Sequence, residues 1–135
     1  MRYLVDANVL SEPTKAQPSD KVVHWLARNE RDVIVDSIIL GELCIGVLAL
    51  PRGRKRVKLE EWFAVLARTI HCLPWDLAVS RHWAELVVTL KRKGAVMPLL
   101  DGMIAATAIA HGLTVVTRNV RDFAKAGVDV LDPFA

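Results

Sequence analysis

Three carboxylates stand out because small or apolar residues surround each of them. Asp6 follows the apolar run Tyr3–Val5, Glu42 lies within "IILGELCIG", and Asp101 follows "VMPLL" and opens "DGMIAATAIA". The intervals of 36 and 59 residues are too long for a local ligand motif, so only the fold could bring these acids together. Gathered acids repel one another, and their pKa values rise unless a divalent cation neutralises them. Oxygen-rich acidic sites of this kind suit Mg²⁺ or Mn²⁺.

Each acid also has a purely structural interpretation. Asp101 can be the N-cap of the helix that follows it, and Asp6 can form an Asx-turn. Glu42 can point to solvent or pair with a Lys or Arg. Taken singly, therefore, none of the three identifies a site.

The chain alternates β-rich and helical segments, which predicts a parallel sheet covered on both faces. In such sheets sites form at the carboxyl ends of the strands, where Asp6 and the turn Thr117-Arg118-Asn119 are expected. The Thr117 hydroxyl can orient an acid or a water there, or make a local turn bond. Strands are predicted at 3–5, 33–35, 70–73, 113–116 and 128–131. Helices are predicted at 21–30, 38–50, 58–69, 77–94 and 101–111, the last ending before Gly112. Their predicted N-caps are Ser19 or Asp20 for the first, Ser37 for the second, Asp76 for the fourth and Asp101 for the fifth. The first helix has Val23, Leu26 and Ala27 on one face.

Length and composition bound the class of protein. The 135 residues predict one domain, 1–135, and 53% apolar residues with a mean hydropathy of +0.29 favour a buried homodimer or partner surface. The sequence has no apolar run of the roughly 20 residues that span a bilayer, and no secretory signal. We therefore expect a cytoplasmic protein with no membrane association. Cys44 and Cys72 are interpreted as small core residues.

Other chemistries fit poorly. The four histidines are scattered without ligand spacing, and no serine lies in a nucleophile elbow. The net charge of +3 permits nucleic-acid binding without requiring it. The run "RGRKRVK" at 52–58 is either an RNA-backbone contact or a solvated loop and helix start.

Three motifs, in order along the chain, give a family resemblance. The opening "YLVDANVLSE", then "DSIILGELCIGV", then "MPLLDGMIAATAIAHGLTVVTRNVRDF" resemble the three acidic motifs of PIN-domain ribonucleases, specifically the VapC-like toxins of toxin–antitoxin pairs. The resemblance implies a three-layer α/β/α sandwich with a central parallel sheet. It also implies that Asp6, Glu42 and Asp101 are metal-binding catalytic carboxylates.

The fourth position of the family's acidic site departs from the pattern. Many relatives have an acid in the turn after the fourth strand, where this chain has Asn119. Asn119 offers a neutral oxygen to a metal or a water but adds no charge, which weakens the case for a second metal ion. Asp122, three residues on, is the alternative acid.

The resemblance implies a Mg²⁺- or Mn²⁺-dependent endoribonuclease that hydrolyses an RNA phosphodiester. It further implies a cognate antitoxin whose tail covers the acidic pocket with an arginine, and a homodimer. A non-catalytic RNA- or protein-binding module on the same fold remains the alternative, supported by Asn119. A DNA-directed nuclease is a weaker third reading, because carboxylates do not distinguish the sugars.

Overall fold

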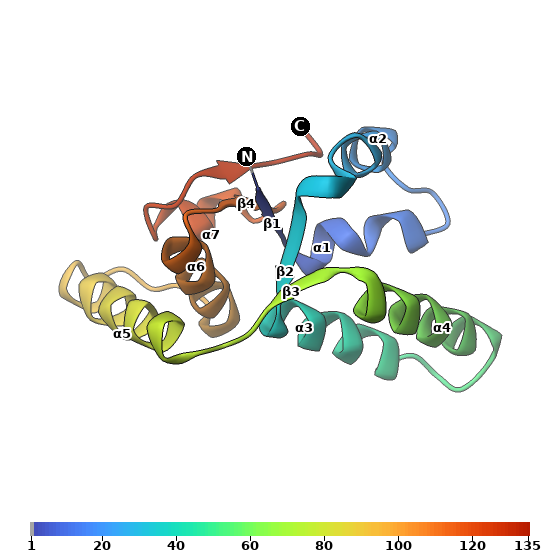
Figure 1. Ribbon diagram of the computed structural model, residues 1–135, viewed down its shortest axis with the longest axis horizontal. Helices are drawn as coiled ribbons and strands as arrows, with labels where there is room; N and C mark the ends of the chain where they lie inside the picture. Colours follow the sequence, from blue (N-terminus) through green and yellow to red (C-terminus); the bar gives the residue numbers. More distant parts are fainter. Residues whose placement is uncertain (1) are drawn as a thin grey trace.

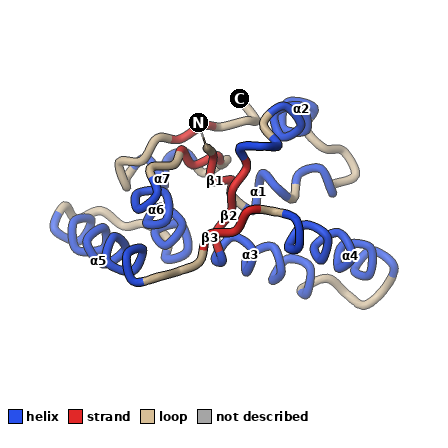
Figure 2. The backbone as a smooth tube through the Cα atoms, in the orientation of Figure 1, coloured by secondary structure: helices blue, strands red, loops and turns tan. Residues whose placement is uncertain are grey.

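A five-stranded parallel sheet forms the centre of the computed structural model, which describes residues 2–135 (Figure 2). The strand order is β3-β2-β1-β4-β5, so the opening strand lies in the middle of the sheet. All five predicted strands are present. Their bounds are β1 Tyr3–Val5, β2 Val33–Asp36, β3 His71–Leu73, β4 Thr114–Val116 and β5 Val130–Leu131.

Helices cover both faces of the sheet. Figure 1 shows α5, α6 and α7 on one side and α1 to α4 on the other, which is the predicted three-layer α/β/α arrangement. The helices are α1 Ala7–Leu10, α2 Asp20–Arg28, α3 Ser37–Leu48, α4 Arg54–Thr69, α5 Leu77–Arg92, α6 Leu99–His111 and α7 Val120–Ala124, with short 3₁₀ helices at Glu12–Thr14 and Glu30–Asp32. Within residues 2–135, none of these helices is both long and apolar enough to cross a membrane.

The strand register places the ends of β1, β2 and β4 at one edge. Leu4 is opposite Ile34 on one side and Val115 on the other, and the Asp6 N–H donates to the Val116 carbonyl at 2.9 Å. Because all strands are parallel, whatever follows each of them lies at the same edge of the sheet. That edge holds the candidate site.

Strand side chains and α6 make the centre of the core. The side chains of Leu4, Val5 and Val116 are fully buried, as expected for central strands with helices on both faces. Helix α6 lies between the sheet and α5, and its residues 101–108 are buried apart from the half-buried Met103. Small side chains in this stretch keep the helix close to both neighbours.

The helix starts confirm some capping predictions and correct others. Ser19 caps α2 and Asp76 caps α5, as predicted. Helix α3, however, is capped by Asp36, whose Oδ1 accepts the Ile39 N–H at 2.8 Å. Ser37 is the first helical residue instead, and its hydroxyl donates to the Leu73 carbonyl at 3.3 Å. Helix α6 starts at Leu99, so Asp101 lies within its first turn and is not its N-cap.

Further corrections concern helix lengths and faces. The apolar periodicity missed α1 and α7, which are too short to show it, and α4 starts four residues before the predicted 58. Helix α2 buries Val22 and Trp25, and the Trp25 ring packs edge-on against Tyr3 at a centroid distance of 5.0 Å. Of the predicted face, Leu26 packs against the core and Ala27 is exposed. Both cysteines are free and half-buried, so the core interpretation holds only in part.

Candidate active site

Asp6 is buried at the end of β1 and is held by three donors. Its Oδ1 accepts the Ala7 N–H at 2.8 Å, which caps α1, and its Oδ2 accepts the Thr117 hydroxyl at 2.7 Å and the Asn8 amide at 3.2 Å. Burial nevertheless raises the pKa of Asp6, against the opposing effect of these hydrogen bonds. The local hydrogen bond that the Asx-turn interpretation expected is therefore present, and the role of Asp6 in a metal site stays a prediction.

Asp36 repeats this arrangement at the end of β2 and was missed by the sequence reasoning. The side chain is 1% exposed, its Oδ2 accepts the Thr107 hydroxyl at 2.6 Å, and its Oδ1 caps α3. Burial raises its pKa, and the nearby charge of Asp6 adds to the rise. The available signal was the order of residues: Asp36 follows "VIV" as Asp6 follows "YLV".

Glu42 projects from α3 with one carboxylate oxygen unsatisfied. Its Oε1 is buried and has no hydrogen-bond partner. Burial raises the pKa of Glu42 to about 7, with further increases from the charges of Asp6, Asp101 and Asp36. Among residues 2–135 no Lys or Arg forms an ion pair with Glu42, so that alternative is wrong, and the half-buried side chain faces a groove instead of open solvent.

Asp101 lies in the first turn of α6 and is 8% exposed. Burial raises its pKa to about 6, and the charges of Asp6 and Asp122 contribute. The fold thus brings Asp6, Glu42 and Asp101 into one electrostatic cluster together with Asp36. We call these four residues the acid pocket.

The acid pocket contains no compensating cation in the described part of the chain. The ion pairs there join Lys15 to Glu12, Arg56 to Glu60 and Lys125 to Asp122. The pocket also lacks a finished ligand cage: among residues 2–135, no three His, Cys, Asp or Glu side chains are placed so that they could hold a metal ion as they stand. The unpaired Glu42 oxygen and the purely oxygen donor set still fit a hard divalent cation.

The segment after β4 contains both candidates for the fourth acidic position, Asn119 just before α7 and Asp122 within it. Asn119 is exposed, and its backbone N–H donates to the Thr117 hydroxyl at 3.0 Å, so Thr117 serves both the local turn and Asp6. Asp122, in α7, is half-buried, lies 3.4 Å from the Lys125 ammonium, and raises the pKa of Asp101. The charge of Asp122 therefore reaches the pocket, and a role for the Asn119 side chain stays a prediction.

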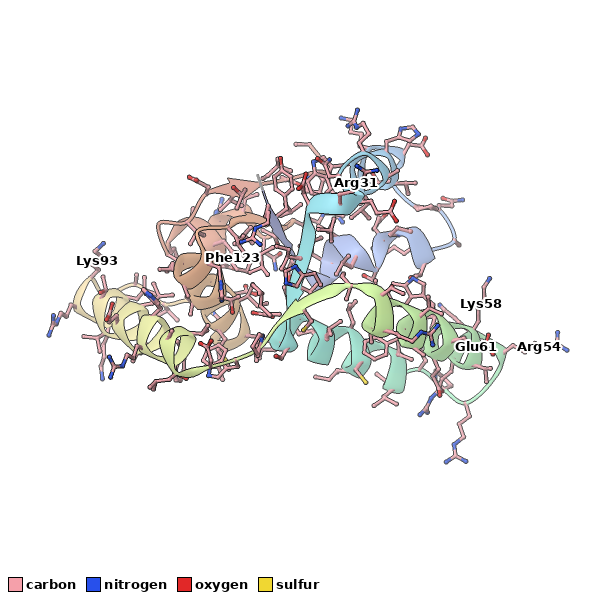
Figure 3. All side chains as sticks on the ribbon, in the orientation of Figure 1. Arg31, Arg54, Lys58, Glu61, Lys93 and Phe123 are labelled. Atoms are coloured by element: carbon pink, nitrogen blue, oxygen red, sulfur yellow. The ribbon has the colours of Figure 1, made fainter. Side chains whose placement is uncertain are left out.

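A groove of about 290 Å³ runs from the pocket between α1, α3 and α4. Asn8 and Glu42 lie in its lining, as do Trp62, Lys15 and Lys55. The rest of the basic run is mostly solvated. Figure 3 shows Arg54 and Lys58 projecting from α4 away from the sheet. Of the predicted basic run, only Lys55 is in the groove lining.

A family model described as the PIN domain matches residues 3–128. The chain belongs to the PIN-domain family. Over 97% of its length it is 39% identical to VapC ribonuclease Y4jK of Sinorhizobium fredii, of which it covers 96%. The crystal structure of FitAcB from Neisseria gonorrhoeae is similar over 98% of both chains, with 37% identity and a TM-score of 0.88.

Another solved structure extends the comparison to a more distant member. VapBC-5 of Mycobacterium tuberculosis, a member of the VapBC family of toxin–antitoxin systems, is 31% identical with a TM-score of 0.64 over 73% of this chain and 80% of that one. The predicted α/β fold is thereby confirmed as that of a PIN domain. The predicted site residues lie within the matched part of the chain, and their catalytic roles stay predictions; they are Asp6, Glu42, Asp101 and Asn119.

The raised pKa of Glu42 predicts how the stability of the metal-free PIN domain depends on pH. The folded-state pKa is about 7 against 4.5 in the unfolded chain, so folding is disfavoured as Glu42 ionises, and stability falls as pH rises through this interval. We expect Glu42→Gln to be about 1–2 kcal/mol more stable than wild type at pH 8, after allowing for partial exposure, and to converge with it near pH 4.5.

Urea unfolding in EDTA at several pH values measures this difference. Glu85→Gln, an exposed acid on α5, is the matched control and should follow the wild-type pH profile. If the unfolding free energies of Glu42→Gln and wild type had the same pH dependence, Glu42 would not interact with the other acids of the acid pocket.

Proposed function

We propose that this PIN domain is a Mg²⁺- or Mn²⁺-dependent endoribonuclease and the toxin of a toxin–antitoxin pair. The observation that carries the proposal is the acid pocket: buried, mutually repelling carboxylates with no ion-paired cation among residues 2–135. Such a pocket is costly to fold and useful only if a cation neutralises it. The identity to VapC ribonuclease Y4jK along the chain supports the substrate class.

Asp6, Glu42 and Asp101 would hold the cation. When bound, it would supply an acidified water and neutralise charge on the phosphate. Thr117 and Asn8 fix the Asp6 carboxylate through hydrogen bonds, which keeps one oxygen edge in a defined direction. Asp36 orients Glu42 indirectly, because it caps the helix that carries Glu42.

An RNA strand would approach along the groove. Lys15 and Lys55 in the lining are suited to phosphate oxygens, and the Trp62 ring offers a surface on which a base can stack. These groups sit on the α3–α4 side of the pocket. They supply affinity without recognising particular bases, so they suit single-stranded RNA of any base sequence. Action on cellular RNA would place the protein in the cytoplasm.

The proposed antitoxin would occupy the same groove. Its walls include Leu59 and Trp62, which suit an apolar stretch of peptide, and the groove reaches Glu42. An arginine from the antitoxin would replace the cation's charge with bidentate hydrogen bonds to the carboxylates. The similarity to VapBC-5, which belongs to a toxin–antitoxin system, supports a partner of this kind.

A homodimer would use the opposite side of the molecule. Exposed apolar side chains gather on α5 and the segment leading into α6, including Val87, Val88, Val96 and Leu99, with Val96 79% exposed. A hollow of about 330 Å³ lies among them. Contiguous apolar surface of this kind is typical of an interface between copies of a chain.

The nuclease proposal is tested by incubating purified, partner-free protein with a mixed cellular RNA pool. We expect cleavage with Mg²⁺ or Mn²⁺ and none with EDTA. Asp101→Asn should reduce the cleavage rate by at least about 100-fold, because it removes a charged ligand from the pocket. Asp101 is a cleaner choice than Asp6, whose replacement would also disturb three hydrogen bonds.

Two controls make the result interpretable. Asp20→Asn, an exposed acid at the start of α2, should cleave at the wild-type rate. Circular dichroism should show both variants folded. Cleavage that survives EDTA, or that Asp101→Asn retains, would contradict the proposal, and absence of cleavage under either metal would favour the binding module.

The two partner surfaces are tested with a reciprocal pair of variants. We expect Val96→Glu to abolish self-association in sedimentation velocity and to leave binding to the co-expressed cognate antitoxin intact. Leu59→Glu, confirmed as folded, should do the reverse, since a buried unpaired charge opposes each contact. If either variant loses both associations, or neither association, the assignment of the surfaces is wrong.

A further inference from the structure

The backbone of Arg118 lies next to the acid pocket, and its side chain takes no part in the mechanism described above. It follows Thr117 directly, and its backbone N–H donates to the Asn8 Oδ1 at 3.1 Å. The same Asn8 donates to Asp6 through its amide nitrogen. The position of the Arg118 backbone is therefore fixed by the network that fixes Asp6.

The guanidinium of Arg118 lies over the ring of Phe134, with Cζ 4.3 Å from the ring centroid. Phe134 is half-buried, follows the buried Pro133, and donates its backbone N–H to the Asp132 carboxylate at 2.9 Å. The segment after β5 thus forms a platform beneath the cation. Stacking covers one face of a guanidinium and leaves its N–H edges free to donate.

The charge of Arg118 is not consumed by an ion pair within residues 2–135. The charge of Arg118 lowers the pKa of Glu12, but by less than the hydrogen bonds from Lys15 and Ser19 do. The charge of Glu12 is already opposed by the Lys15 ammonium, which lies 2.9 Å from Oε1, and its Oε2 accepts the Ser19 N–H at 2.8 Å. The exposed guanidinium of Arg118 is therefore available to an anionic partner from outside the chain.

We propose that Arg118 binds a phosphate of the RNA strand beside the scissile bond, and that Phe134 is the positioning residue that holds its guanidinium. This inference rests on the proposed nuclease function. Lys55 supplies a cation on the groove side of the pocket, and Arg118, which follows β4, supplies one on the other side. A strand crossing the pocket would then be held on both sides of the carboxylates, which themselves repel it.

The binding test uses Asp101→Asn protein, which should bind RNA without cutting it, and a fluorescent single-stranded RNA oligonucleotide. Adding Arg118→Ala should weaken binding about tenfold at low salt, and should reduce the slope of log K against log salt by about 0.7, the value for one lost phosphate contact. Arg28→Ala, an exposed arginine at the end of α2, is the matched control and should change neither quantity.

Kinetics on the otherwise wild-type chain separate positioning from structure. Arg118→Ala should raise KM about tenfold with kcat within about twofold, because phosphate binding is equal in ground and transition states. Phe134→Leu should raise KM about threefold, and Phe134→Trp should restore it, since either aromatic ring can hold the cation. A purely structural role for Phe134 would lower thermal stability in both variants without this rescue.

The outcomes distinguish failure of the nuclease proposal from failure of the Arg118 proposal. If wild-type protein fails to cleave RNA with metal, the nuclease proposal itself falls. If wild type cleaves and Arg118→Ala leaves both the salt slope and KM unchanged, only the Arg118 inference is overturned. Weakened antitoxin binding with unchanged RNA binding would overturn it as well, by assigning the guanidinium to a protein carboxylate.

Discussion

The structure depends on one unfavourable interaction, the burial of carboxylates within reach of one another at the edge of the sheet. Glu42 is the extreme case, because it has a buried oxygen without a partner and feels the charges of three other acids. Packing elsewhere must offset this repulsion in the metal-free protein. A divalent cation relieves it, so binding of the cation and stability of the fold are linked.

The elements around the pocket are arranged to hold its acids in place. Asp6 and Asp36 each end a strand, each cap the following helix, and each accept a threonine hydroxyl, from Thr117 and Thr107. These bonds fix the two acids at the strand ends, while Glu42 and Asp101 reach the pocket from helices on opposite faces of the sheet (Figure 1). Parallel topology supplies the common edge, and the helices supply the remaining charges.

The sequence predicted the sheet, the layers and three of the pocket acids, because apolar runs and acids out of context are local signals. It did not predict the cap of α3, since Ser37 and Asp36 are both good N-caps and only the chain geometry decides between them. It also missed Asp36 as a pocket acid. Helix α6 starts at Leu99, directly after Pro98, whereas the sequence predicts a start at Asp101 because aspartate is a favoured N-cap residue.

Other features depend on contacts between distant segments and could not be read from periodicity. The buried face of α2 is set by Trp25 against Tyr3, and the position of Arg118 by Phe134. The fourth acidic position is of the same kind: the motif resemblance leaves Asn119 and Asp122 as alternatives, and the charge that reaches Asp101 comes from Asp122. The effect of one charge on the pKa of another group depends on their separation in the folded protein, not on the position of the residue in a sequence motif.

Proton release on cation binding tests the central claim most directly. Isothermal titration of Mn²⁺ into the protein, in buffers of different ionisation enthalpy, measures the protons displaced. With pKa values of about 7 for Glu42 and about 6 for Asp101, binding at pH 6.5 should release about one proton per cation, and at pH 8.5 almost none. Binding that releases no protons at pH 6.5, or that Glu42→Gln leaves unchanged in proton count, would contradict the account.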